Sequence, residues 1–390
     1  MFKDASLSAV VAGFIAVLVG FTSSVAIVFQ AAQALGATAA QTTSWIWAIG
    51  VGTGLTSIGL SWRYRQPVLT AWSTPGAALL AAVHGFGLAE ATGAFIFSAV
   101  LILLAGASGL FERVMGRVPV AIAAALLAGV LTRFGLDAVA AVHEDAFLVC
   151  AMAVVFIVGR RWWPRFAVPG VLLAGIVVAA AGGRIALGEV QWAWARPAWV
   201  TPAFSAAAAI SVGLPLFIVT MASQNLPGVA AQRAAGVTAP VSPVIATTGL
   251  ATLLLAPFGA FGLNLAAITA AICMGPEAHE DPGRRYVAAM AAGAFYLALG
   301  LAGGAVVGLM AAFPRALVVA IAGLALVGTI AGALAAALTV ERHRDAALLT
   351  FLVTLSGVTL AGLGAPFWGV VAGSIALAVQ HWRTPPVARA

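Results

Sequence analysis

The sequence predicts an all-α polytopic membrane protein whose fourteen transmembrane segments form two inverted repeats of seven. Three observations support this prediction. Hydrophobic residues make up 63% of the chain and charged residues only 8%, which is too apolar for a soluble globular protein. The basic residues are scattered between long apolar runs. Two runs are short and interrupted by glycine and proline, and each is the third run of its half.

The segments follow from apolar runs of about 20 residues, with allowance for short and tilted helices. The first seven centre on residues 9–32, 45–60, 68–83, 92–104, 118–131, 146–158 and 167–181. The second seven centre on residues 203–221, 241–256, 257–274, 286–310, 316–338, 346–363 and 367–379. Segments 3 and 10 are expected to be short strand-plus-half-helix elements.

The basic residues predict the orientation, because short loops rich in Lys and Arg stay in the cytoplasm. With the N-terminus inside, fifteen of the nineteen basic residues are cytoplasmic, and the four others are Arg133, Arg184, Arg196 and Arg315. Seven is an odd number, so the second half starts from the opposite face and both termini are cytoplasmic. Exchanging the conformations of two inverted halves converts an inward-open state into an outward-open one.

The two broken segments are the best candidates for a binding site. In segment 3, Thr74 suits the N-cap of a half-helix and Pro75 its first helical position. In segment 10, glycines loosen the chain before Asn264, which would cap a helix over Leu265–Met274. Two helix N-termini that face each other form an anion site without a buried cation. Alternatively, Gly and Pro merely kink these helices for packing.

Other polar side chains within the apolar runs are weaker candidates. Gln224 and Asn225 lie in the predicted end of segment 8, residues 221–228, and would either bind a carboxylate or cap the neighbouring half-helix. The cluster Thr22–Ser24 is expected mainly to pack helices, because such hydroxyls often bond to the carbonyl one turn back. Gln30 is equally ambiguous.

The sequence lacks the residue patterns that several other classes of protein require. All twelve carboxylates and five histidines lie at predicted segment ends or loops, and His84 reads as a surface cap. Nucleophile elbows, metal motifs and phosphate loops are missing from the sequence, so neither an enzyme nor a metal or cofactor is expected. The scattered basic residues, for a net charge of +7, fit membrane orientation and exclude a nucleic-acid partner.

Four stretches resemble the BenE family of bacterial benzoate/proton symporters. The specific ones are YRQPVLTAWSTPGAALL (64–80) and LPLFIVTMASQNLPGVA (214–230), and the others are residues 8–37 and 259–275. The resemblance implies the inverted-repeat fold of uracil permease and the solute carrier 26 (SLC26) anion transporters. It implies a core domain (1–115 and 200–311), a gate domain (116–199 and 312–390), a ligand between the half-helices, and a homodimer.

The resemblance also implies where this chain departs from its nucleobase-transporting relatives. In those relatives, segments 8 and 10 each supply a glutamate to the ligand. Here the corresponding positions hold Ser223 or Gln224, and Leu263 beside Asn264. An acidic side chain would repel a carboxylate, so the departure favours an anion over a nucleobase. Apolar neighbours such as Ala71, Phe261 and Leu263 would cover an aromatic ring.

The resulting hypothesis is proton-coupled uptake of benzoate, or a similar aromatic carboxylate, across the lipid bilayer of a bacterial inner membrane. Alternatives are transport of another small anion or a nucleobase-like ligand, and an anion channel. The predicted substrate-binding residues come from both broken segments and from segments 1 and 8: Ser24, Gln30, Ser73, Thr74, Pro75, Gly76, Ser223, Gln224, Asn225, Leu263 and Asn264.

Overall fold

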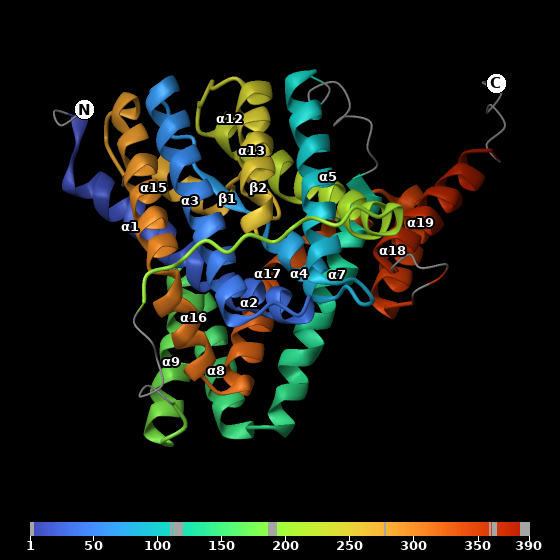
Figure 1. Ribbon diagram of the computed structural model, residues 1–390, viewed down its shortest axis with the longest axis horizontal. Coiled ribbons are helices and arrows are strands. Elements are labelled where there is room, and N and C mark those ends of the chain that lie inside the picture. Colours follow the sequence, from blue (N-terminus) through green and yellow to red (C-terminus); the bar gives the residue numbers. More distant parts are fainter. Residues whose placement is uncertain are drawn as a thin grey trace.

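The protein is almost entirely helical (Figure 1). The structure is a computed structural model that describes residues 4–109, 111, 120–185, 193–276, 278–358, 360 and 365–382. Two short strands, β1 (Thr70–Trp72) and β2 (Leu263–Leu265), form a two-stranded sheet in the middle of the molecule.

The helices precede β1, lie between β1 and β2, or follow β2 in the chain. Those of the first half are α1 (Leu7–Thr22), α2 (Val25–Ala34), α3 (Ala39–Tyr64), α4 (Thr74–Ala81), α5 (Leu88–Ala107), α7 (Val120–Ala140), α8 (Ala146–Trp162) and α9 (Ala167–Ala181). Those of the second half are α10 (Ala206–Ala208), α11 (Leu214–Thr220), α12 (Leu226–Ala234), α13 (Val241–Leu255), α14 (Ile268–Met274), α15 (Tyr286–Leu301), α16 (Gly303–Ala312), α17 (Arg315–Leu338), α18 (Arg344–Ser356) and α19 (Ala365–Trp382).

Some of these helices are long and apolar enough to cross a bilayer. Within the described ranges there are six such helical runs, which include α1 with α2 (Leu7–Ala34) and α10 to α12 (Ala206–Arg233). There are seven if α15 and α16, which meet at a 67° bend, count as one span. The remaining predicted segments coincide with helices that are shorter, broken or, like α3, richer in hydroxyl side chains. The count of fourteen spans and the inversion of the halves therefore stay predictions.

Segments 1 and 8 depart from their predicted form. Segment 1 breaks between α1 and α2, where the hydroxyls of Thr22 and Ser24 donate to the carbonyls of Leu18 and Gly20, each at 2.7 Å. Segment 8, predicted to end within residues 221–228, continues instead through a π-helical turn, Met221–Asn225, into α12, which ends at Ala234. A wider turn of this kind often marks a functional site.

Three helix pairs form the main packing contacts: α3 with α15, α5 with α13, and α7 with α17. Glycines bring their backbones together, as small residues do in membrane proteins. A Cβ added to Gly50 would lie 2.6 Å from the Cα of Gly300, and one added to Gly249 would lie 2.6 Å from the nitrogen of Leu103. The first two pairs support the two broken segments.

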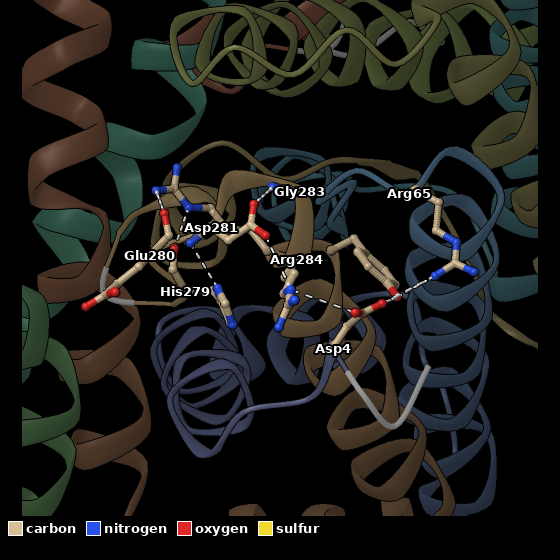
Figure 2. Close-up of polar contacts among 9 residues, drawn as sticks. Asp4, Arg65, His279, Glu280, Asp281, Gly283 and Arg284 are labelled. Carbon is tan, nitrogen blue, oxygen red and sulfur yellow. Dashed lines mark hydrogen bonds and ion pairs between the residues drawn. The ribbon is translucent and has the colours of Figure 1, made fainter.

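A polar cluster joins the segment before α1 to the ends of α3 and α15. Figure 2 shows the carboxylate of Asp4 between Arg65 and Arg284. Asp4 accepts a 2.8 Å hydrogen bond from the hydroxyl of Tyr286, and its carboxylate lies 3.7 and 3.8 Å from the two guanidinium groups. The cluster therefore holds α1 against its neighbours.

The pKa of Asp4 is lowered from 3.8, first by the hydrogen bond from Tyr286 and then by the charges of Arg284 and Arg65. A lowered pKa stabilises the fold at pH above 3.8, and this contribution is lost as the pH falls below it. We expect Asp4→Asn to lower the melting temperature of the detergent-solubilised protein at pH 7 by about 1–3 °C, as for an exposed ion pair. The difference in melting temperature between Asp4→Asn and wild type should disappear as the pH falls below 3.8.

The matched control is Glu341→Gln, which removes a more exposed ion pair, 3.6 Å from Arg344, at the turn before α18. Melting curves of both variants across pH 3 to 8 test the prediction. A pH-independent deficit in Asp4→Asn would mean that its charge does not stabilise the fold.

Candidate functional site

The two broken segments cross and pair with each other. Strands β1 and β2 are antiparallel, with Thr70 opposite Leu265, Ala71 opposite Asn264, and Trp72 opposite Leu263. Just beyond the strands, Ser73 N–H donates to the carbonyl of Gly262 at 2.8 Å. Residues about 190 positions apart in the chain thus form one small sheet between two half-helices, as Figure 1 shows for β1, β2 and α4.

Side chains complete the outer edges of this sheet. On the β1 edge, the N–H of Thr70 donates to Ser57 Oγ at 3.0 Å. On the β2 edge, the N–H of Leu263 donates to Thr252 Oγ1 and that of Leu265 to Asn225 Oδ1, both at 2.9 Å. An unpaired backbone N–H is costly away from water. The fully buried Asn225 is therefore part of the scaffold of the sheet.

The first half-helix, α4, begins one residue earlier than predicted. Its N-cap is Ser73, not Thr74: Ser73 has extended backbone angles, and its Oγ accepts from the N–H of Gly76 at 3.0 Å. The same Oγ accepts from the hydroxyl of Thr220 at 3.1 Å. Thr74 is the first helical residue and Pro75 the second. Neither the N–H nor the hydroxyl of Thr74 has a partner in the described part of the chain.

The second half-helix, α14, begins three residues later than predicted. Asn264 is not its N-cap, because the pairing of β2 with β1 keeps Leu263–Leu265 extended. The N-cap is Ala267, which offers no side-chain acceptor, so the first N–H groups of α14 are uncapped. Asn264 is fully buried, and its amide donates to the carbonyl of Gly262 at 3.1 Å.

A cavity of about 670 Å³ lies beside the crossing of the two segments. One wall comes from α1, the two half-helices, the π-helical turn and α15, and it includes these residues: Val19, Ser23, Ser24, Ala71, Trp72, Thr74, Pro75, Ser223, Gln224, Ala266, Ala267, Thr269 and Tyr296. The opposite wall comes from α7, α8, α9 and α17, and it includes these residues: Val120, Leu127, Arg160, Val168, Leu326, Gly328, Thr329 and Ala333.

The polar groups of the cavity fall into two sets. The hydroxyls of Ser23, Ser24 and Ser223 donate to carbonyls of the preceding turn, so they are already satisfied. The second set has no hydrogen-bond partner within the described residues and is free to contact a ligand; its members on the first wall are Thr74, Gln224, Thr269 and Tyr296. These free groups come from four different elements and converge on one space.

Two aromatic side chains, Trp72 and Tyr296, belong to the same wall. Trp72 packs edge-on against Tyr296, with ring centroids 5.5 Å apart, and against Phe21 at 6.1 Å. Both Trp72 and Tyr296 are almost completely buried yet line the cavity. A flat apolar ligand there would therefore reach the small accessible part of each ring.

The structure divides the predicted site residues into two groups. Five of them line the cavity: Ser24, Thr74, Pro75, Ser223 and Gln224. Five others lie in the scaffold behind it: Ser73, Gly76, Asn225, Leu263 and Asn264. Gln30 lies apart from both groups, in a second hollow of about 780 Å³ that also contacts Asp137, Glu144 and Arg315.

Sequence reasoning missed several residues of the cavity, among them Trp72, Tyr296, Thr269 and Arg160. Tyr296 is one of only three tyrosines in the chain and interrupts an apolar run, which is a usable signal. Thr269 gave no such signal, because threonines are frequent in these helices. The sequence centres the sixth segment on residues 146–158 and puts Arg160 on the cytoplasmic side of it, whereas α8 continues to Trp162.

Comparisons with known proteins agree with this architecture. The family model described as "Benzoate membrane transport protein" (BenE) matches residues 3–379. An Escherichia coli protein named "Inner membrane protein YdcO" is 50% identical over 95% of both chains. The "Benzoate membrane transport protein" of Acinetobacter baylyi is 40% identical, over 96% of this chain and 95% of its own.

Two solved structures share the fold. The transmembrane domain of the cyanobacterial bicarbonate transporter BicA aligns with a TM-score of 0.60 at 14% identity, over 95% of this chain and 97% of its own. The murine anion transporter Slc26a9 aligns with a TM-score of 0.58 at 11% identity, over 97% of this chain and 68% of its own. The chain has the helical fold of these membrane transporters and belongs to the BenE family of transport proteins.

Proposed function

We propose that the protein is a secondary active transporter that takes up benzoate or a similar aromatic carboxylate together with protons. The observation that supports this most directly is the combination of free hydrogen-bond donors with an aromatic wall in one cavity. The 40% identical relative is named as a benzoate transport protein and the 50% identical one as an inner membrane protein. The bacterial inner membrane is accordingly the proposed location.

The carboxylate would bind at the start of α4. The free donors there are the N–H and hydroxyl of Thr74, and the amide of Gln224 approaches from the π-helical turn. The positive end of the α4 dipole adds to their attraction for an anion. No carboxylate occurs among the described lining residues, so nothing on these walls repels a negative ligand.

The ring would lie against Trp72 and Tyr296. A cavity of about 670 Å³ falls within the usual range for small-molecule sites, and its lining is mainly apolar. Phe261 and Leu263, expected from the sequence to cover the ring, lie buried behind the cavity. Trp72 and Tyr296 take their place in the proposal.

Alternating access would move a core domain (1–115 and 200–311) against a gate domain (116–199 and 312–390). The boundary at 115/116 lies outside the described residues, but the two walls of the cavity come from the two proposed domains. The packing pairs support an inverted repeat. In such a repeat α3, α5 and α7 of the first half correspond to α13, α15 and α17 of the second. The pair α3–α15 then corresponds to the pair α13–α5, and the pair α7–α17 corresponds to itself.

The proposed orientation, with both termini cytoplasmic, determines which side of the membrane the cavity faces. The cavity is lined by the first half of α7, the second half of α17 and the end of α8. All three lie toward the face that the basic residues place inside. The cavity thus represents an inward-facing state.

The proposal also includes a homodimer in the lipid bilayer, which rests on the family resemblance.

The test is a flux assay in proteoliposomes with labelled benzoate. Uphill accumulation driven by an imposed pH gradient, and absent without it, is the expected result. Purely downhill flux would instead indicate a channel. Binding assays of the purified protein with benzoate, chloride, sulfate and uracil test the substrate class, and uracil binding without benzoate binding would refute the proposal.

We expect Gln224→Ala to raise the KM for benzoate about tenfold while leaving the melting temperature unchanged. A hydrogen bond to a charged group is worth about 1.5–3 kcal/mol, and no hydrogen bond within the described chain depends on this amide. The matched control is Gln33→Ala, which removes an amide from the second hollow. Equal KM values for both variants would exclude Gln224 from the site.

A further inference from the structure

Arg160 is the one charged side chain among the described lining residues of the cavity. It lies in the last turn of α8, on the wall opposite the start of α4. Its neighbour Arg161, on the same helix turn, does not line the cavity. Both arginines are solvent-exposed. Orientation in the membrane accounts for two positive charges at this helix end, but it does not explain why Arg160 also lines the cavity.

Two uncharged neighbours hold the guanidinium group of Arg160. Its central carbon lies 5.8 Å from the centroid of the Phe156 ring, in a cation–π contact. On α17, the absence of a side chain at Gly328 makes room for it, since a Cβ there would lie 3.0 Å from Nη1. Neither neighbour accepts a hydrogen bond through its side chain, so the N–H donors of the guanidinium remain free.

No counter-ion balances this charge within the described part of the chain. Arg160 takes part in none of its ion pairs or hydrogen bonds, and the other described lining residues are uncharged. Arg160 is solvent-exposed, so its charge attracts an anion in the same space through a partly screened interaction. A guanidinium fork matches the two oxygens of a carboxylate better than other cationic side chains do.

We propose that Arg160 forms a second, gate-side contact for the substrate carboxylate, used when the cavity faces the cytoplasm. This inference rests on the proposed function and adds a residue to that same site. Thr74 and Gln224 belong to the opposite wall, so a relative movement of the walls separates them from Arg160. The arginine then stabilises the ligand in one state of the cycle only and sets the affinity on the cytoplasmic side.

The test compares Arg160→Gln and Arg160→Lys with Arg161→Gln as the matched control. Benzoate affinity is measured on the cytoplasmic side of inside-out vesicles and on the external side of right-side-out vesicles, at low and high salt. We expect Arg160→Gln to weaken cytoplasmic-side affinity about five- to tenfold at low salt, as for loss of one partly screened charge contact. Arg160→Lys should recover part of the lost affinity, and Arg161→Gln should have the cytoplasmic-side affinity of wild type.

Salt dependence separates a direct contact from a structural role. Wild-type cytoplasmic-side affinity should fall with added salt, and Arg160→Gln should remove most of this dependence. Equal cytoplasmic-side affinities in Arg160→Gln and Arg161→Gln would overturn the inference while leaving the proposed function intact. A wild-type protein that binds no benzoate on either side would overturn both.

Discussion

Replacing Gly259 with alanine is expected to prevent folding of the transporter, the largest stability effect of any change considered. Gly259 has a φ of +108°, a conformation that L-residues rarely adopt. An added Cβ would lie 2.0 Å from Cδ1 and 2.5 Å from Cγ of Trp45. Backbone strain and overpacking each cost about 1–3 kcal/mol, a large part of the stability of a typical protein.

The ring of Trp45 has no room to move away. It packs against Phe95 and Phe261, with centroids 5.5 and 5.6 Å away, and is itself 1% exposed. Gly259 also makes the turn between α13 and β2, where the N–H of Ala260 reaches back to the carbonyl of Leu255 at 3.1 Å. A shift of this turn would therefore displace β2 and alter the cavity beside it.

Size-exclusion profiles and melting curves of the detergent-solubilised protein measure the effect of Gly259→Ala. The matched control is Gly59→Ala in the helix interior of α3, where a Cβ would contact nothing within 4 Å. The melting temperature of that control should equal or slightly exceed that of wild type, because alanine has a higher helix propensity than glycine. A monodisperse Gly259→Ala protein with wild-type melting would show that the turn tolerates a side chain.

Much of the fold can be predicted from the sequence, because the positions of membrane helices follow from the length of apolar runs and from the glycines and prolines that interrupt them. The predicted segment at residues 167–181 coincides with α9, and both broken segments lie where the glycines and prolines indicate. The starts of the half-helices are less readable. Asn264 is a good N-cap by residue type, but pairing with β1 holds it in a strand. A distant partner thus overrides the local preference.

The candidate site was readable only in part, for a similar reason. Sequence places Thr74 and Gln224 near a broken helix, and the structure has both in the cavity. Tyr296 and Arg160 reach the same space from α15 and α8, which no local pattern connects with β1. Their roles depend on helix packing between distant parts of the chain.

Asn225→Ala is expected to lower both stability and transport, unlike the adjacent Gln224→Ala. The two amides follow each other in the sequence and look equivalent there. In the structure, Asn225 is fully buried and accepts from the N–H of Leu265, whereas Gln224 lines the cavity. Leaving that N–H unpaired costs about 1–3 kcal/mol, and it releases the edge of β2 that positions the start of α14.

The pair of variants separates scaffold from ligand contact, provided that stability and kinetics are measured on the same preparations. Asn225→Ala should melt several degrees below wild type and lose most benzoate uptake, whereas Gln224→Ala should keep its melting temperature and raise KM alone. Asn225→Ser offers a shorter acceptor and should recover part of the stability if the N–H of Leu265 is the cause. Normal melting of Asn225→Ala with a raised KM would instead make Asn225 a ligand contact, because a residue that only supports β2 cannot change affinity without weakening the fold.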